Sequence, residues 1–481
     1  MSQRLDPSIL REYDIRGVVG ANLFARDARA IGFAFAGIMH ERRLAPEGER
    51  PCVAVGYDGR LSSPMLEAAL VEGLVAGEVD VIRIGLSTTP MLYFAEASSP
   101  EVQGGIQVTG SHNPKDHNGF KIVCAGAPFF GGDIAKLGER IEAAGQGGDI
   151  AASGVGGTIG VEQGRVERRE FLVAYTDRLL ADLAGVDGDA LARLRIGWDT
   201  GNGAGGPIVQ ALTARLPGEH HLLFPEVDGH FPHHHPDPTV ECNLADLRSL
   251  VVARQLDFGV AFDGDADRIG LVDGLGRVVW GDQILMILAQ DLLQRMPDAL
   301  ILADVKASQA LFDHVAALGG RTAMWKTGHS LIKSRMKETG APLAGEMTGH
   351  LFFAENWYGF DDGMLAALRL MAASVRLGQS ITDLRSAMPE MAATPELRIS
   401  VAAGRGPALV RAVRDGVVGQ GRAVDETDGI RVSGPDGWWL LRASNTEAKL
   451  SARVEGGTPQ ALERLLADLD GHLAAVGVVR G

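Results

Sequence analysis

The sequence predicts a multidomain α/β protein with a small α+β domain at its C-terminus. This prediction rests on the length of the chain, on repeated strand–turn–helix cycles, and on a final stretch with a different pattern. At about 100–200 residues per domain, a chain of 481 residues corresponds to roughly three or four domains. Hydrophobic residues make up 46% and charged residues 22%, which is typical of globular proteins that bury a core.

The first cycles alternate short apolar runs with turns and one clear helical pattern. Apolar runs at 51–55, 79–84 and 106–108 predict strands, and residues 64–75 predict a helix. Because ligand loops of α/β sheets follow the ends of strands, we expect binding residues in the turns after these runs. Residues 144–164 are rich in Gly, Ala and Ser and are expected to form a domain linker.

A second and a third cycle follow the linker. The second opens with a strand at 194–198, a Gly-rich turn and a helix from about Pro207, and continues to a strand at 258–262. The third begins near Trp280 and has a strand at 300–304. Repetition of the same unit suggests that these domains are related, although residue-level repetition is weak.

The last stretch, from about residue 389, has short strands at 397–402 and 438–442. Its closing segment, 459–476, places leucines at helical spacing, which predicts a helix with one buried face. A small α+β domain fits this order of elements.

Charge and cysteine usage restrict the class of protein. A net charge of −15 argues against nucleic acid as the main partner but leaves an anionic substrate open. Cys52, Cys124 and Cys242 are far apart and lack metal-ligand spacing, so we expect neither a disulfide framework nor a zinc site. The charged N-terminus does not resemble a secretory signal, and no apolar run is long enough to span a bilayer. We therefore expect a cytoplasmic protein that does not bind membranes.

The segment Thr109–Pro114 follows the apolar run 106–108. Thr109 and Gly110 favour a sharp turn, and Asn113-Pro114 requires an extended or turn conformation. We expect Ser111 to stand exposed at the tip of this turn, within reach of a ligand. Taken alone, the pattern is more typical of a helix N-cap or an ordinary turn serine.

Three aspartates, Asp263, Asp265 and Asp267, alternate directly after an apolar strand. Carboxylates this close repel one another unless a cation neutralises them, and oxygen ligands suit Mg²⁺. A calcium EF-hand is excluded because its sixth position would be Arg268 and its twelfth Gly274. A solvated acidic turn is the alternative.

The histidine-rich loop 231–238 lacks zinc-ligand spacing and is expected to be a structured loop between domains.

Two further loops carry groups that suit a phosphorylated sugar. Glu346 and Thr348 could bind vicinal hydroxyls, or could act in a cap or turn. The second loop combines one cationic side chain with several neutral hydrogen-bond donors, and such a set of groups matches the oxygens of an anion. These groups are Arg442, Ser444, Asn445 and Thr446. No Gly-x-x-x-x-Gly-Lys-Ser/Thr stretch is present, so an ATP-binding P-loop is not supported.

Together these motifs resemble the α-D-phosphohexomutase family, and most closely its bacterial phosphomannomutase/phosphoglucomutase branch. Residues 109–114 resemble its phosphoserine loop, 263–268 its magnesium loop, 345–350 its sugar-specificity loop and 442–447 its phosphate-binding loop. The segments around Tyr13, the histidine-rich loop and residues 325–333 match as well, so the resemblance covers essentially the whole chain.

The resemblance implies four domains around a central cleft, of which three are related mixed α/β sandwich domains and the fourth is small and α+β. The expected boundaries are 1–160, 161–275, 276–388 and 389–481. It also implies small-molecule hexose phosphates as partners, no nucleic acid or membrane partner, and a monomer or weak homodimer.

The implied activity is a phosphomannomutase/phosphoglucomutase reaction of carbohydrate metabolism, an intramolecular phosphotransfer of the isomerase class. Phosphorylated Ser111 would convert a hexose 1-phosphate to the 6-phosphate through a hexose 1,6-bisphosphate, with glucose 1,6-bisphosphate as activator. Mg²⁺ would be bound by Asp263, Asp265, Asp267 and a phosphoryl oxygen on Ser111. Arg16, Lys121 and His112 would lie near the reacting phosphoryl. The implied substrate-binding residues are Tyr13, Arg268, Lys306, His329, Glu346, Thr348, Arg442, Ser444, Asn445 and Thr446.

Two positions depart from the family pattern. Thr348 stands where this branch usually has Ser. Ala448 stands where the family commonly has a Pro after Asn-Thr-Glu. Met347 favours this branch over phosphoglucosamine mutase, which remains the alternative within the family. A sugar-phosphate phosphatase, in which water accepts the phosphoryl group, and a non-catalytic sugar-phosphate sensor are the alternatives outside it.

Overall fold

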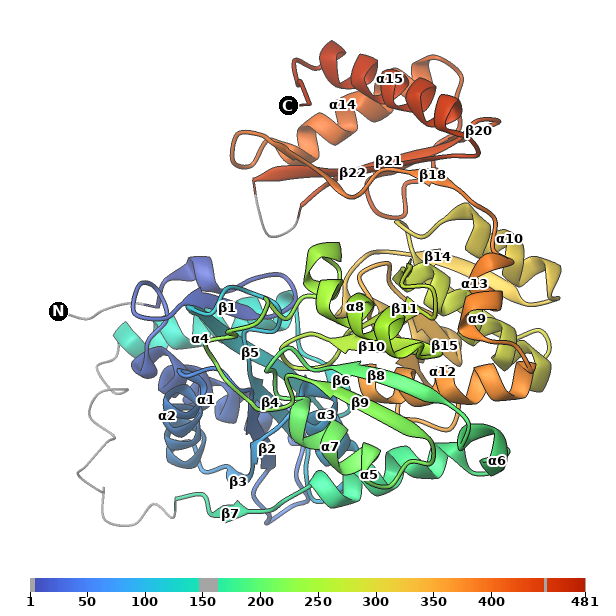
Figure 1. Ribbon diagram of the computed structural model, residues 1–481. Coiled ribbons are helices and arrows are strands. Elements are labelled where there is room, and N and C mark those ends of the chain that lie inside the picture. The colour runs from blue at the N-terminus through green and yellow to red at the C-terminus, as the bar shows by residue number, and fades with distance from the viewer. Residues whose placement is uncertain (1–4, 147–162, 445–447, 481) are drawn as a thin grey trace. The chain divides into compact units, whose positions relative to one another are not determined.

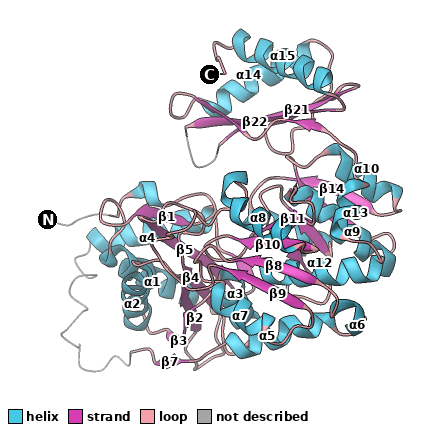
Figure 2. Cartoon of the chain, viewed as in Figure 1, coloured by secondary structure: helices cyan, strands magenta, loops and turns pink. Residues whose placement is uncertain are grey.

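The computed structural model describes residues 5–146, 163–444 and 448–480 (Figure 1). The chain divides into two compact units. The first unit contains residues 1–280 and 348–382, and the second contains residues 281–347 and 383–481. The strands form four sheets, and helices accompany each of them (Figure 2).

The N-terminal sheet of the first unit has the strand order β1-β5-β4-β2-β3-β7, and the short β6 pairs with β5. Its central strands β4, β2 and β3 are parallel, whereas β5 runs antiparallel between β4 and β1. The strands are β1 Ile15–Val18, β2 Cys52–Tyr57, β3 Asp80–Leu86, β4 Gly104–Val108, β5 His117–Cys124, β6 Ala127–Pro128 and β7 Val166–Arg168. The helices are η1 Pro7–Ile9, α1 Ala25–Glu41, α2 Ser63–Ala76, α3 Thr89–Ser98 and α4 Gly132–Gln146.

The second sheet of this unit has the order β12-β11-β10-β8-β9. β8 is parallel to β9 and β10, and β10 forms an antiparallel hairpin with β11. The strands are β8 Arg195–Asp199, β9 Glu219–Leu223, β10 Phe258–Phe262, β11 Ile269–Asp273 and β12 Val278–Val279. The helices are α5 Leu172–Leu180, η2 Ala181–Leu183, α6 Gly188–Leu191, α7 Gly206–Thr213, η3 Glu241–Leu244 and α8 Ala245–Arg254. The unit also contains the antiparallel pair β16 Leu351–Phe353 and β17 Phe360–Asp361, followed by α12 Gly363–Leu377.

The second unit contains a parallel layer and an antiparallel sheet. The parallel strands are β13 Leu300–Asp304, β14 Arg321–Trp325 and β15 Leu343–Gly345, with helices α9 Gly281–Arg295, α10 Gln309–Ala317 and α11 His329–Thr339. The C-terminal sheet is antiparallel throughout, in the order β18-β22-β21-β20, with β19 also paired to β22. Its elements are β18 Ala392–Ala393, β19 Leu397–Ser400, β20 Ile430–Gly434, β21 Gly437–Ala443, β22 Lys449–Gly456, α14 Gly406–Gly419 and α15 Pro459–Ala475. The short helix α13 Ile381–Ser386 crosses the boundary between the units.

The predicted fold class, α/β layers followed by a small α+β domain, is confirmed. The leucine face predicted for the closing helix is present in α15, where Leu465, Leu469 and Leu473 are buried. The strand β1 is not among the elements predicted from the sequence, because residues 11–17 are rich in charge and contain a glycine. Its partner β5 lies about a hundred residues away in the chain, and the pattern of residues 15–18 alone carries too little signal for so short a strand.

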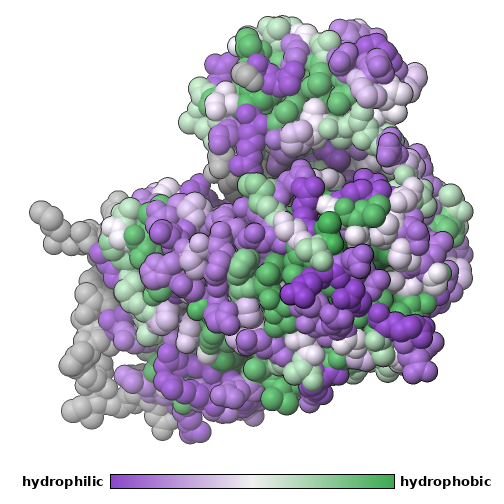
Figure 3. Space-filling model, in the orientation of Figure 1, coloured by the Kyte–Doolittle hydropathy of each residue, from purple (hydrophilic) through white to green (hydrophobic). Residues whose placement is uncertain are grey.

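No helix within the described ranges is long and apolar enough to cross a membrane. Figure 3 shows hydrophilic and hydrophobic residues interspersed over the face in view. The cysteines Cys52, Cys124 and Cys242 are all free thiols.

Candidate active site

Ser111 lies in the turn between β4 and β5, and only 1% of its surface is exposed. The expectation of an exposed serine is therefore wrong. The turn packs closely on the loop after β10, where a Cβ atom on Gly264 would lie 2.5 Å from the carbonyl oxygen of Ser111. Ser111 also has φ of +48°, in the left-handed region that costs free energy for a residue with a side chain. Its surroundings must therefore hold this conformation.

Asp58, just after β2, holds the first half of the turn. Its Oδ2 accepts hydrogen bonds from Thr109 Oγ1 at 2.8 Å and from the Gly110 N–H at 3.1 Å. Its Oδ1 accepts the Ser63 hydroxyl at 2.6 Å. The carboxylate is buried, so these donors stabilise a charge that would otherwise be costly to bury.

Arg60, two residues further on, holds the second half of the turn. Its side chain is 1% exposed and lies 3.3 Å from the Asp58 carboxylate. The guanidinium donates to carbonyl oxygens of the serine loop: Ser111 at 2.7 Å, Asn113 at 2.5 Å, Pro114 at 2.6 Å and His117 at 2.9 Å. A planar fork with several donors suits such a set of acceptors, whereas a lysine could not reach all of them.

The aspartates Asp263, Asp265 and Asp267 occupy the turn between β10 and β11, and all three are fully buried. One carboxylate oxygen of each lies within 4.8 Å of the others. β10 is apolar, β11 is apolar up to its last residue Asp273, and both strands are buried along their whole length, so the hairpin holds the acidic turn in place. The sequence therefore predicted both the strand and the convergence of the carboxylates.

Ser111 and Asp263 bring the two loops together. The Ser111 hydroxyl donates to Asp263 Oδ2 at 2.7 Å, and the Arg268 N–H donates to Asp263 Oδ1 at 3.2 Å. Burial raises the pKa of Asp263 well above its usual range, and the neighbouring carboxylates of Asp265 and Asp267 raise it further. Additional positive charge at this turn would therefore stabilise its ionised form.

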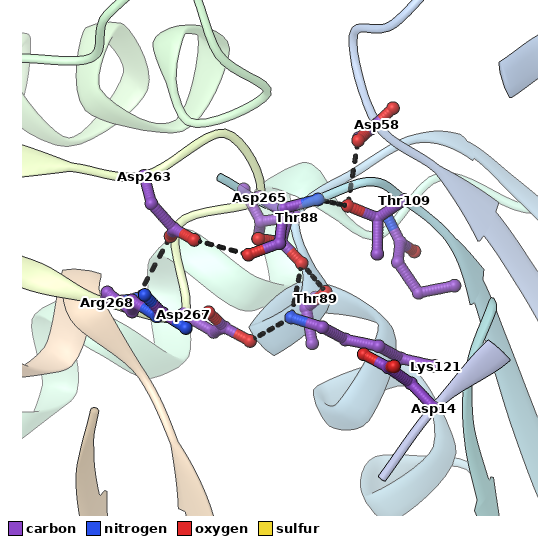
Figure 4. Close-up of polar contacts among 12 residues, drawn as sticks. Asp14, Asp58, Thr88, Thr89, Thr109, Lys121, Asp263, Asp265, Asp267 and Arg268 are labelled. Atoms are coloured by element: carbon purple, nitrogen blue, oxygen red, sulfur yellow. Dashed lines mark hydrogen bonds and ion pairs between the residues drawn. The ribbon is translucent and has the colours of Figure 1, made fainter. Parts of the chain in front are cut away.

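Lys121 on β5 supplies part of that charge (Figure 4). Its ammonium group donates to Asp265 Oδ2 at 2.7 Å and to Asp267 Oδ2. Burial alone would lower the pKa of Lys121, but the two carboxylates raise it above its usual value. Burial alone would likewise raise the pKa of Asp265, whereas Lys121 and a hydrogen bond from Thr89 lower it.

The donor set fits a hard divalent cation. Oδ1 of Asp265 and Oδ1 of Asp267 are buried and, within the part of the chain that the structure describes, accept no hydrogen bond. Unpaired buried carboxylate oxygens are costly, and oxygen ligands of this type are those that Mg²⁺ prefers. These two oxygens and Asp263 therefore form a site that a magnesium ion would complete.

Two other predicted residues, Arg16 and His112, contact the serine turn, and the placement of Tyr13 is given by its position before β1. Arg16 on β1 donates to Asn113 Oδ1 at 2.9 Å and pairs with Asp14 at 2.6 Å. His112 Nδ1 lies 3.1 Å from the Ser111 hydroxyl, and burial together with the positive charge of Arg268 lowers the pKa of His112. Tyr13 is half-buried just before β1.

His350 and Asp361 also contact this site, although neither is among the predicted site residues. Arg268 Nε donates to His350 Nε2 at 2.9 Å, and His350 Nδ1 lies 2.8 Å from Asp361 Oδ2. His350 closes the motif at 345–350 and could have been found from it. Asp361 on β17 carried no sequence signal, whereas Asp58 and Arg60 lie in the turn after the run 51–55, where binding residues are expected but not named individually.

The histidine-rich loop is structured, and it belongs to the surroundings of the serine turn. His235 Nε2 hydrogen-bonds the backbone oxygen of His112. His234 Nε2 contacts the buried carboxylate of Asp199 at 3.0 Å, and His233 stacks on Phe224 with ring centroids 3.9 Å apart. Each histidine contacts a different neighbour.

Within the second unit, the loop before α11 connects two predicted substrate-binding residues. The Gly328 N–H donates to the buried Glu346 carboxylate at 2.6 Å, and His329 is the first residue of α11. The Thr327 N–H donates to Asp428 at 3.1 Å, and Asp428 pairs with Arg442 at 2.9 Å. Glu346 thus contacts this loop directly, and Arg442 is connected to it through Asp428.

The remaining predicted residues are dispersed. Lys306 is 3% exposed, and its ammonium lies 3.9 Å from both Asp304 and Glu396. Ser444 is half-buried after β21, and Thr348 is half-buried in the first unit. Asn445 and Thr446 lie outside the described residues, as does most of the expected linker at 144–164.

The chemistry that the first unit can support is phosphoryl transfer. A buried hydroxyl is hydrogen-bonded to one of three convergent carboxylates, and Lys121, Arg16 and Arg268 surround them. Phosphoryl transfer depends mainly on charge neutralisation and on alignment of the transferred group. A buried hydroxyl beside a group of carboxylates that could hold a cation meets both requirements.

Comparison with known proteins agrees with this geometry. Models of the α/β/α domains I, II and III of phosphoglucomutase/phosphomannomutase match residues 7–147, 174–276 and 280–391, and that of its C-terminal domain matches 396–472. A phosphomannomutase/phosphoglucomutase of Pseudomonas aeruginosa is 44% identical over 98% of this chain and 96% of its own.

Two further relatives show the same extent of similarity. A phosphoglucomutase of Neisseria gonorrhoeae is 40% identical over 95% of each chain. The crystal structure of a phosphoglucomutase/phosphomannomutase family protein from Burkholderia thailandensis is 39% identical, with a TM-score of 0.87 over 98% of both chains. The predicted family is confirmed: the chain belongs to the phosphoglucomutase/phosphomannomutase family.

Proposed function

We propose that the protein interconverts the 1-phosphates and 6-phosphates of mannose and glucose. The observation that carries the proposal is the 2.7 Å hydrogen bond from the Ser111 hydroxyl to Asp263, inside a group of three buried carboxylates. Similarity to a phosphomannomutase/phosphoglucomutase over 98% of the chain supports the same activity.

In the proposed reaction, phosphorylated Ser111 gives its phosphoryl group to the 6-hydroxyl of a hexose 1-phosphate. The bond from phosphorus to Ser111 Oγ breaks, a bond to the sugar oxygen forms, and the proton of that hydroxyl is transferred to a base. The hexose 1,6-bisphosphate then reverses its orientation and returns its 1-phosphoryl group to Ser111, leaving the hexose 6-phosphate. Added glucose 1,6-bisphosphate would rephosphorylate an enzyme that has lost its phosphoryl group.

Asp263, Asp265 and Asp267, with an oxygen of the phosphoserine, would bind Mg²⁺. When bound, the ion would offset negative charge on the transferred group. Lys121 orients Asp265 and Asp267 through the hydrogen bonds from its ammonium group. Arg60 and Asp58 hold the turn so that Ser111 faces the carboxylates rather than solvent.

Sugar recognition is assigned by the family resemblance. Lys306, His329, Arg442 and Ser444, with Asn445 and Thr446, would bind the phosphate that does not react. Glu346 and Thr348 would bind the 3- and 4-hydroxyls. Because both orientations of the sugar must bind, specificity would rest on hydroxyls that superpose. Mannose and glucose differ only at C2, so both would be accepted.

The test is a parallel assay of mannose 1-phosphate, glucose 1-phosphate and glucosamine 1-phosphate with Mg²⁺ and a trace of glucose 1,6-bisphosphate. We expect turnover of the first two and little of the third. A preference for glucosamine 1-phosphate would indicate phosphoglucosamine mutase instead. Release of inorganic phosphate at the rate of sugar-phosphate consumption would indicate a phosphatase, and no turnover would refute the proposal.

We also expect the enzyme to act in the cytoplasm as a monomer or weak homodimer, with hexose phosphates as its partners. Analytical ultracentrifugation at micromolar concentration would test the oligomeric state. A stable higher oligomer would contradict this expectation.

A further inference from the structure

Helix α3 begins with two threonines that have different partners. Thr88 Oγ1 accepts the Met91 N–H at 3.2 Å and caps the helix. Thr89 is therefore not needed as a cap, and its hydroxyl donates to Asp265 Oδ2 at 2.5 Å. Its N–H donates to the backbone oxygen of Asp265 at 3.0 Å. Both threonines are fully buried, so neither hydroxyl has solvent as an alternative partner.

These contacts make the two oxygens of Asp265 unequal. Oδ2 accepts hydrogen bonds from Thr89 and from Lys121, whereas Oδ1 is buried and accepts none from the residues that the structure describes. Rotating the carboxylate to exchange the oxygens would break both hydrogen bonds. Oδ1 is thereby presented to a cation in a fixed direction.

Thr89 and Lys121 do not contribute to this in the same way. Lys121 is positively charged, is shared with Asp267, and repels a second cation at the site. The Thr89 hydroxyl is neutral, so it orients Asp265 without reducing the negative charge available to a cation. Loss of a residue that hydrogen-bonds a metal ligand, without itself binding the metal, commonly weakens metal affinity by about 10–100-fold.

We propose that Thr89 is a positioning residue of the metal site, which fixes the carboxylate of Asp265 so that Oδ1 faces the ion. The inference rests on the magnesium site of the proposed function and adds a determinant of metal affinity from another element, α3. Thr89 touches neither the substrate nor the reacting phosphoryl group in this role.

The test is Thr89→Val, which removes the hydroxyl but keeps the shape and the backbone N–H. Isothermal titration of the full-length, dephosphorylated protein with Mg²⁺ should show a dissociation constant raised about tenfold or more. Thr89→Ser keeps a hydroxyl, so its Mg²⁺ dissociation constant should lie within about threefold of the wild-type value. The Mg²⁺ concentration for half-maximal turnover should rise with the dissociation constant, while kcat at saturating Mg²⁺ stays close to that of the wild type.

Thr88→Val is the matched control, since it removes the helix cap one residue away. It should lower the melting temperature and leave the Mg²⁺ dissociation constant unchanged. If Thr89→Val does not fold, Thr89→Ala is titrated in its place. An unchanged dissociation constant in the variant that folds, or equal losses in Thr89→Val and Thr89→Ser, would overturn the inference. If the wild-type protein does not bind Mg²⁺, the metal site of the proposed function fails instead.

Discussion

The hydroxyl of Ser111 and the carboxylate of Asp263 lie 2.7 Å apart, although 152 positions separate them in the chain. One residue follows β4 of the first sheet, and the other follows β10 of the second. Their contact joins a potential phosphoryl carrier to a potential cation site, and it is the relationship from which the proposed chemistry follows.

Ser111→Ala should reduce turnover by at least about a thousandfold, because loss of a nucleophile removes the covalent route altogether. The variant should also fail to take up phosphate from glucose 1,6-bisphosphate, as measured by intact mass. Ser98→Ala is a matched control, because the Ser98 hydroxyl donates to the Phe94 carbonyl oxygen within its own helix, α3. A Ser111→Ala protein that is still phosphorylated and active would show that another residue carries the group.

Arg60→Lys should lower kcat about tenfold or more with little change in KM. Lysine keeps the charge but cannot donate to all the carbonyl oxygens that Arg60 holds, and each buried acceptor left unpaired costs about 1–3 kcal/mol. Steady-state kinetics and thermal melting measure the two effects, and added guanidinium at millimolar concentration should partly restore kcat in Arg60→Ala.

Arg83→Lys is the matched control for this prediction. Arg83 on β3 forms a similar pair with the buried Glu67, away from the serine turn. The Arg83→Lys variant should be less stable than the wild type and should retain the wild-type kcat. Equal effects of the two lysine substitutions on kcat would mean that Arg60 acts only through general stability.

Removing divalent cations with a chelator should abolish turnover, and added Mg²⁺ should raise the melting temperature. The ion would relieve repulsion among Asp263, Asp265 and Asp267, and binding to the folded state alone stabilises that state. Asp267→Asn should weaken Mg²⁺ binding about tenfold or more, measured by titration. Asp291→Asn, at a buried carboxylate of α9 that pairs with Arg295, should leave it unchanged. A chelated enzyme with full activity would contradict the metal site.

Asp362 should make the free energy of unfolding fall as the pH rises from about 4 to about 7. This fully buried carboxyl caps α12 and accepts the Tyr175 hydroxyl, and burial raises its pKa to about 7. The folded state therefore binds a proton that the unfolded state, with a pKa of about 3.9, releases. The stabilisation is complete below about pH 4 and is lost as the pH rises through about 7.

Asp362→Asn keeps the cap and removes the titration, so it should remove a pH dependence of up to about 4 kcal/mol. Urea unfolding at several pH values measures the change. The same substitution at Asp187, an exposed cap of α6, should leave the pH dependence as in the wild type. An Asp362→Asn protein that keeps the full pH dependence would assign it to another group.

Much of the fold could be predicted because its signals are local. The apolar run at 258–262, the alternating aspartates after it and the leucine face of α15 each follow from neighbouring residues. The order of the motifs along the chain identified the family, which the comparisons confirmed. The expected domain boundaries and the roles of the substrate-binding residues remain predictions.

The sequence by itself determined which chemical groups the protein carries and in which loops they stand: the serine turn, the aspartates and the predicted phosphate-binding motif. Only the tertiary structure decided that Ser111 is buried, that Arg60 holds its turn, and that Thr89 contacts Asp265 from 176 positions away. The physical reason is that these contacts join the ends of strands and helices that are distant in the chain. Their partners are chosen by how the sheets and helices pack, and no local pattern records that choice.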